Sequence, residues 1–100
     1  MVEITWTRVS IRDLKEIYEY IAQDSERYAQ ITVNKIYQRT KILESNPRIG
    51  KIVSELKDDR IREIVSGNYR IIYHIIHDNR IDILRVFHSA RLLKKNSNKF

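Results

Sequence analysis

The strongest constraint on the fold is a run of three apolar segments in the second half of the sequence, separated by two short turn signals. The segments are "IREIV", "YRIIYHII" and "RIDILRVFH", with Gly67–Asn68 and Asp78–Asn79 between them. The turn residues tolerate the positive φ of tight hairpins, and segments rich in β-branched and aromatic residues favour strands. The second half therefore predicts three consecutive antiparallel strands.

The first half of the sequence predicts a short strand followed by two helices. Residues 2–6 alternate between apolar and polar side chains, which is the period of a half-buried strand. Thr7 or Ser10 can cap the first helix, and Asp13 follows Ser10 at the spacing of a capping box. The predicted apolar stripe of this helix consists of Ile11, Leu14, Ile17 and Ile21.

The second helix is expected to begin after Ser25 and to end at Asn46–Pro47, because proline disfavours helical geometry in the residue before it. Its predicted stripe consists of Ala29, Val33, Ile36, Thr40 and Leu43. Two amphipathic helices joined by a short break predict an antiparallel hairpin lying on an apolar surface. The expected fold is therefore α+β, in the order β-α-α-β-β-β, with a helical hairpin packed on a mainly antiparallel sheet. Residues 1–100 are expected to form a single domain.

Positive charge is concentrated at the C-terminal end. The formal net charge is +6, and residues 85–100 hold five basic side chains and no acidic one, which leaves 14 basic and 13 acidic side chains elsewhere. Residues 89–100 are expected to form a basic C-terminal tail. Such a tail either keeps the protein soluble or contacts a polyanion or an acidic partner protein.

A two-residue turn at Asp78–Asn79 predicts how the last two strands pair. Counting back from this turn places Arg70 opposite Phe87, and His74 opposite Ile83. The face expected to be semi-exposed carries Arg70, Ile72, His74, Ile76, Ile81, Ile83, Arg85 and Phe87. The face expected to meet the helices carries Tyr69, Ile71, Tyr73, Ile75, Asp82, Leu84, Val86 and His88.

Arg70 interrupts an apolar strand, and burying an unpaired cation there would be costly. Its side chain can reach solvent, pair with Glu63 on the neighbouring strand, or lie against the ring of Phe87. Alternatively, Arg70, Arg85 and Phe87, with His88 and Arg91 at the strand end, form a site for phosphate or an acidic peptide. The residues alone leave these possibilities open.

The order of these segments resembles the RelE/ParE superfamily of toxins from type II toxin–antitoxin pairs. The resemblance covers nearly the whole chain and is carried by the helical hairpin, "NPRIG", "YRIIY" and "VFH" followed by Arg91. It implies a growth-inhibiting toxin that a cognate antitoxin holds inactive. A partner protein is expected to bury the face bearing Ile72, Ile83 and Phe87.

The superfamily divides by target, and one branch contains ribosome-dependent nucleases that cut mRNA. For that branch the resemblance implies that Arg70 and Arg91 stabilise and orient the phosphate, with His88 as general acid or base and Glu63 as a possible base. The sequence departs from the nuclease pattern in two places. Ile61 and Glu63 stand where basic residues are expected, and Ser97 stands where a tyrosine is expected.

The other branch contains ParE-like toxins that inhibit DNA gyrase, and the "FHSAR" ending and the missing tyrosine favour it. Arg70 and His88 are then mainly structural, and the strand-end face with the basic tail binds the target or the antitoxin. The candidate binding residues are Arg70, Ile72, Ile83, Arg85, Phe87, Arg91, Lys94 and Lys95. A simple interaction module without toxicity is a third possibility.

Several other classes of site are not expected. The sequence has no cysteine, which excludes a disulfide framework and any thiolate metal site. Its three histidines lack metal-binding spacing with carboxylates, and it has no glycine-rich phosphate loop. We therefore expect no metal, cofactor or small-molecule ligand. No apolar run approaches the ~18 residues of a membrane span, so we expect a cytoplasmic protein without membrane contact.

Overall fold

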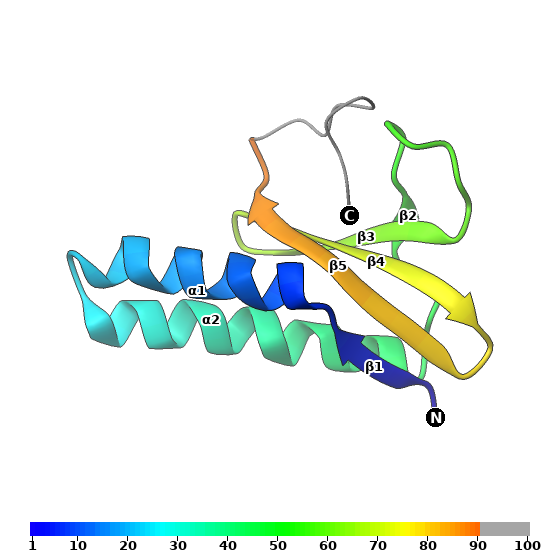
Figure 1. Cartoon of the computed structure of the whole chain (residues 1–100), viewed down its shortest axis with the longest axis horizontal. Coiled ribbons are helices and arrows are strands. Elements are labelled where there is room, and N and C mark those ends of the chain that lie inside the picture. The colour runs from blue at the N-terminus through cyan, green and yellow to red at the C-terminus, as the bar shows by residue number, and fades with distance from the viewer. Residues whose placement is uncertain (91–100) are drawn as a thin grey trace.

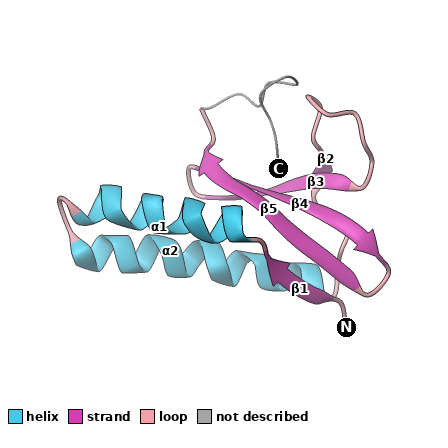
Figure 2. Cartoon of the chain, viewed as in Figure 1, coloured by secondary structure: helices cyan, strands magenta, loops and turns pink. Residues whose placement is uncertain are grey.

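A helical hairpin covers one face of a five-stranded sheet in the computed structural model, which describes residues 1–90 (Figure 1). The hairpin consists of α1 (Arg8–Ala22) and α2 (Glu26–Arg39), and a 3-10 turn (Thr40–Glu44) follows it. The strands are β1 (Glu3–Trp6), β2 (Lys51–Ile52), β3 (Ile61–Ser66), β4 (Tyr69–His77) and β5 (Arg80–His88). The predicted α+β fold class is confirmed, and Figure 2 shows the two layers by element type.

The sheet has the order β1-β5-β4-β3-β2. The first strand, β1, forms one edge of the sheet. It pairs in parallel with β5, from Glu3 opposite Arg80 to Trp6 opposite Ile83. The other neighbouring strands are antiparallel. The long β4–β5 hairpin therefore lies at the centre of the sheet, with β1 on one side and β3 on the other.

Local capping determines where both helices begin. The Thr7 hydroxyl accepts a hydrogen bond from the backbone N–H of Ser10 at 3.1 Å, so Thr7 is the α1 cap and Ser10 lies in the first turn. The predicted cap of the second helix is confirmed, because the Ser25 hydroxyl accepts from the N–H of Tyr28 at 3.0 Å. The second helix is shorter than predicted. It ends at Arg39, where the chain tightens into the 3-10 turn before Pro47. Within residues 1–90 no helix is long and apolar enough to cross a membrane.

The main core lies between the hairpin and the sheet. Its buried members come from both layers and are Ile36, Leu43, Ile64, Ile71, Tyr73, Ile75, Ile81, Ile83 and Val86. Ile11 was expected in the stripe of α1 but is 55% exposed. The buried positions of that helix are taken instead by Ser10 and Asp13, which lie three residues apart on one face and bond to neighbouring backbone.

A second, smaller apolar cluster lies on the opposite face of the sheet. Val53, Ile72 and Phe87 are its buried members. Leu56, Ile61 and Leu84 pack around them. The face expected to be semi-exposed is therefore covered by the chain itself, because Val53 and Leu56 come from the connection between β2 and β3.

Two irregularities in the β4–β5 hairpin correct the predicted register. His77 lies opposite Arg80 and Arg70 opposite Phe87, as predicted. His74, however, pairs with Asp82 and not with Ile83. The register shifts between Ile75 and His77 and again between Ile72 and Tyr73, which leaves Ile76 and Leu84 without partners.

The two shifts exchange the faces of the β5 residues between them, while Tyr73 and Ile75 on β4 keep the predicted face. An extra residue in one strand of an antiparallel pair changes which side chains share a face. Ile81 and Ile83 consequently lie in the core under the helices, whereas Leu84 packs in the second cluster. The prediction that Ile81 and Ile83 belong to the semi-exposed face is wrong, as is the prediction that Leu84 meets the helices.

The "NPRIG" connection is held by the buried phenol of Tyr73. The Tyr73 hydroxyl donates to the carbonyl of Pro47 at 2.7 Å and accepts from the N–H of Gly50 at 3.0 Å. Burial raises the pKa of Tyr73, and its hydrogen bond with Gly50 acts in the opposite direction. A Cβ atom on Gly50 would lie only 2.6 Å from both the Tyr73 hydroxyl and the Glu63 carbonyl. Gly50 is therefore required for this close approach.

We predict that Gly50→Ala lowers the free energy of unfolding by about 1–3 kcal/mol, because the added methyl group must displace backbone and a buried ring. Urea unfolding followed by circular dichroism measures the change. Gly67→Asn is the matched control, since Gly67 has φ +57° and nothing within 4 Å of an added Cβ. Asparagine tolerates that conformation, so the control should lose less than about 1 kcal/mol. Equal losses in the two variants would contradict the steric argument.

Candidate functional site

Arg70 lies on β4, on the face of the sheet away from the helices, and is only 8% exposed. Its guanidinium contacts Glu63 on β3 through Nη2–Oε1 at 2.5 Å and Nε–Oε2 at 3.3 Å. It also contacts Glu55, through Nη1–Oε2 at 3.2 Å and Nη2–Oε1 at 3.3 Å. Of the alternatives that the sequence left open for Arg70, pairing with Glu63 is present, and Glu55 is a second carboxylate partner that was not predicted.

An aromatic ring completes the environment of Arg70. The guanidinium carbon of Arg70 lies 5.4 Å from the ring centroid of Phe87, and that of Arg85 lies 5.9 Å from it. Both distances fall within the range of a cation–π contact. The predicted opposition of Arg70 and Phe87 and the proximity of Arg85 are therefore present, but Phe87 is buried and not part of an open surface.

The charged state of Arg70 is stabilised where it lies. Burial opposes that charge, but the hydrogen bonds that Arg70 donates to Glu63 and Glu55 outweigh it and raise the Arg70 pKa above its ordinary value. Two carboxylates surround one guanidinium, so an approaching phosphate would meet negative charge on either side of the cation. In this arrangement Arg70 organises the fold and does not present an unoccupied cation to an anionic substrate.

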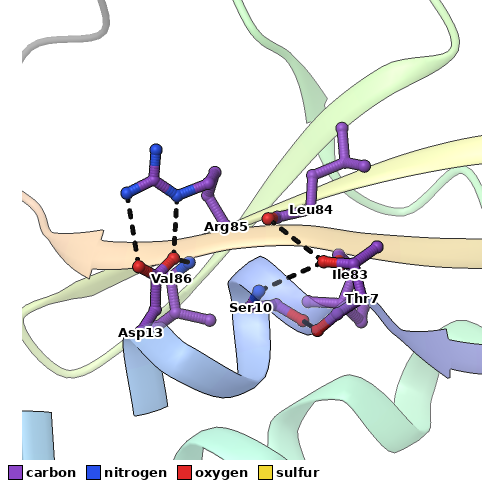
Figure 3. Close-up of polar contacts among 7 residues, drawn as sticks. All are labelled: Thr7, Ser10, Asp13, Ile83, Leu84, Arg85 and Val86. Atoms are coloured by element: carbon purple, nitrogen blue, oxygen red, sulfur yellow. Dashed lines mark hydrogen bonds and ion pairs between the residues drawn. The ribbon is translucent and has the colours of Figure 1, made fainter. Parts of the chain in front are cut away.

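Arg85 is engaged by a different carboxylate, on α1 (Figure 3). Asp13 accepts from Arg85 through Nε–Oδ2 at 2.8 Å and Nη2–Oδ1 at 3.2 Å. The same Oδ2 accepts the backbone N–H of Val86 at 2.8 Å. The pairing of β1 with β5 ends at Trp6, so the next part of β5 has no strand beside it on that edge. Asp13 accepts the backbone N–H of Val86 there in place of a strand.

The loop from β1 to α1 bonds to the same strand. Thr7 donates its backbone N–H and its hydroxyl to the carbonyl of Ile83, at 3.2 Å and 2.8 Å (Figure 3). Thr7 and Asp13 together attach the start of α1 to β5. Sequence analysis assigned Asp13 to a capping box and missed this role. The available signal was a pair of polar residues, Ser10 and Asp13, at the helical spacing of the buried stripe.

His88 is separated from Arg70 by the sheet. It lies opposite Tyr69 in the ladder and contacts that ring edge-on, with the centroids 5.8 Å apart. Tyr69 packs against the helix-side core, whereas Arg70, the next residue, faces the other cluster. Arg70 and His88 therefore lie on opposite faces of the sheet, because neighbouring residues of a strand point to opposite faces, and their joint role at one phosphate stays a prediction.

The remaining candidate binding residues differ in accessibility. Ile72 and Ile83 have no exposed surface and lie on opposite faces, so they cannot belong to one open surface of this chain. The surface predicted to be buried by a partner is already covered within the chain. The predictions for the basic tail from residue 91 onward concern Arg91, Lys94 and Lys95, which lie outside the described residues.

Two hollows lie beside Tyr69 and His88, with volumes of about 250 Å³ and 280 Å³, and neither was predicted from the sequence. Tyr28 and Lys35 of α2 line the first, and Glu16 and Tyr20 of α1 line the second. Tyr20 and Tyr28 are largely exposed. The hollows thus lie where the helical hairpin meets the ends of β4 and β5. Among residues 1–90, no three histidine or acidic side chains are grouped as metal ligands would be.

We predict that Arg70→Met lowers the free energy of unfolding by about 3–5 kcal/mol, because it leaves the Glu63 carboxylate buried without its cation. The double variant Arg70→Met with Glu63→Leu should recover most of that loss, since no unpaired charge stays buried. Urea unfolding measures both. A double variant as unstable as the single variant would show that Arg70 stabilises the fold by some other contact.

Comparisons with known proteins agree with the fold. A family model described as the ParE toxin of type II toxin-antitoxin system, parDE, matches residues 4–93. The chain is similar to Toxin RelE2 of Caulobacter vibrioides, with 28% identity over 92 residues, which is 92% of this chain and all of that protein.

Two solved structures are similar in fold. A chain of the chromosomal ParDE TA system from P. aeruginosa superimposes with a TM-score of 0.72 and 22% identity, over 88% of this chain and 96% of that one. A chain of the YoeB–YefM toxin-antitoxin heterotetramer from Staphylococcus aureus gives 0.52 and 22%, over 88% and 98%. At this identity the structures support the fold alone. The family match, in contrast, spans nearly the whole chain, and the protein therefore belongs to the ParE toxin family of type II toxin–antitoxin systems.

Proposed function

We propose that this toxin inhibits growth by binding DNA gyrase, and that it does not act by cutting mRNA on the ribosome. A cognate antitoxin would hold it inactive, as the type II class implies. The observation that carries the proposal is the state of Arg70, whose guanidinium is buried between the carboxylates of Glu55 and Glu63.

Cleavage of a phosphodiester needs cations or hydrogen-bond donors aimed at the charge that develops on phosphate. Here the strand arginine that the nuclease branch would use already donates to two carboxylates. Glu63 stands where the nuclease pattern has a basic residue, so the local charge is also of the wrong sign. A surface that binds a protein target does not require a free cation at this place.

The position of His88 supports the same conclusion. A general acid or base must lie within hydrogen-bond reach of the reacting oxygen, directly or through one water. His88 accepts the N–H of Ala90 and contacts Tyr69 on the helix side of the sheet, so it does not share a site with Arg70. A nuclease built on these two residues would need them on one face.

Similarity to Toxin RelE2 of Caulobacter vibrioides and to a chain of a YoeB–YefM complex makes mRNA cleavage the second candidate function. Those names do not decide the target of this chain. The two candidates predict opposite results for the purified protein in a gyrase supercoiling assay and in primer extension on translated message.

We predict that the purified toxin, at micromolar concentration, prevents supercoiling of relaxed plasmid by DNA gyrase. It should produce no new 5′ ends on translated message in primer extension. Adding the cognate antitoxin in equimolar amount should restore supercoiling, which is the control for non-specific DNA binding by a basic protein. New 5′ ends that disappear in the His88→Gln variant, with supercoiling unaffected, would overturn the proposal and establish the nuclease.

A further inference from the structure

The connection between β2 and β3 lies on the side of the sheet away from the helices (Figures 1 and 2). Its first part, residues 53–57, contributes all the side chains by which the connection covers the second cluster and Arg70. Val53 is fully buried against Ile72 and Phe87, Leu56 packs around them, and Glu55 binds Arg70. We refer to residues 53–57 as the cover segment.

The backbone of the cover segment bonds to the sheet at its first residue, Val53. The N–H of Val53 donates to the carbonyl of Ile61 at 3.1 Å, whereas the N–H groups of Leu56 and Lys57 both donate back to Val53. Beyond the segment, the carbonyl of Arg60 accepts from Ile75 at 2.8 Å. The middle of the segment is thus held to the sheet by side chains, through Leu56 and through the pair of Glu55 with Arg70.

The segment also ends in a strained conformation. Lys57 has φ 55°, and it is the one non-glycine residue with positive φ among residues 1–90. The left-handed region is unfavourable for a residue with a Cβ, because the Cβ approaches the following carbonyl oxygen. Closure of the segment therefore works against a local backbone cost, which its release would remove.

Opening would not leave a charge unpaired. Glu63 and Arg70 lie on the adjacent strands β3 and β4, so their contact is independent of the cover segment. Glu55 is half-buried at the edge of the site and can be hydrated when it leaves. The two carboxylates therefore differ in role, because Glu63 holds Arg70 in either state and Glu55 holds it only when the segment is closed.

We propose that residues 53–57 form a lid that is latched by Glu55 on Arg70 and opens while the helix-side core stays folded. Opening exposes the apolar side chains of Ile72 and Phe87 and one side of the Arg70 guanidinium. The lid thus controls access to a surface that the closed chain hides.

The absence of cysteine in the chain allows a direct test by thiol labelling. Ile72→Cys places a thiol under the lid, and Ile71→Cys is the matched control in the core under the helices; both isoleucines are fully buried. Under native conditions the thiol of Ile72→Cys should react faster with a soluble disulfide reagent than that of Ile71→Cys. Local opening reaches the first site, whereas the second needs wider unfolding.

Adding Glu55→Gln should raise the reaction rate of Ile72→Cys about tenfold, because it weakens the charge-assisted bond between position 55 and Arg70. A tenfold change corresponds to ~1.4 kcal/mol. The reaction rate of Ile71→Cys should stay unchanged. Equal rates at the two sites, or equal acceleration by Glu55→Gln, would overturn the proposal. If Ile72→Cys does not fold, Val53→Cys on the lid and Val86→Cys in the helix-side core form a second pair with nearly conserved volume, and the same two comparisons apply.

Discussion

The charge of Arg70 is the constraint on which one side of this molecule depends. A guanidinium placed in a central strand must be paired if the strand is to be covered. Glu63 supplies one carboxylate from β3, and Glu55 supplies another only because residues 53–57 fold back over the sheet. That return also brings Val53 and Leu56 onto Ile72 and Phe87. The Glu55–Arg70 pair and the second apolar cluster therefore form together, since each removes water from the other.

Local patterns were sufficient to predict the fold class and the elements except the two-residue strand β2 and the 3-10 turn, which lie in what was predicted as connecting chain. Capping at Ser25, the two turns and the alternation of the strands are signals within a few residues, so the order β-α-α-β-β-β and the position of the helices followed from them. The faces of β5 were harder, because Ile83 and Leu84 are adjacent and both apolar. Hydropathy alone cannot decide which of the two points to the helices, and the irregular register decides it.

The pairing of Arg70 with Phe87 was predicted correctly although the register between them and the turn is irregular. One shift leaves Ile76 unpaired on β4 and the other leaves Leu84 unpaired on β5, so their effects on register cancel and Arg70 still lies opposite Phe87. The contacts that were missed join residues far apart in the chain. Asp13 reaches Val86 from the other end of the sequence, and Glu55 reaches Arg70 through an irregular connection. No periodicity marks such pairs, because they depend on how the elements pack.

The glutamate at position 63 matters for both the fold and the function. Glu63 stands where the nuclease branch has a basic residue, and from sequence this was a departure from the pattern that the resemblance implies. In the structure Glu63 is the carboxylate that neutralises Arg70. A basic residue there would leave Arg70 facing a like charge and favour an anionic ligand, whereas glutamate satisfies the cation within the chain. An arginine in this strand thus indicates phosphate chemistry only when its neighbours leave the cation unsatisfied. Here two carboxylates, Glu55 and Glu63, pair with the guanidinium of Arg70, which supports the proposal that the toxin acts by binding a protein target.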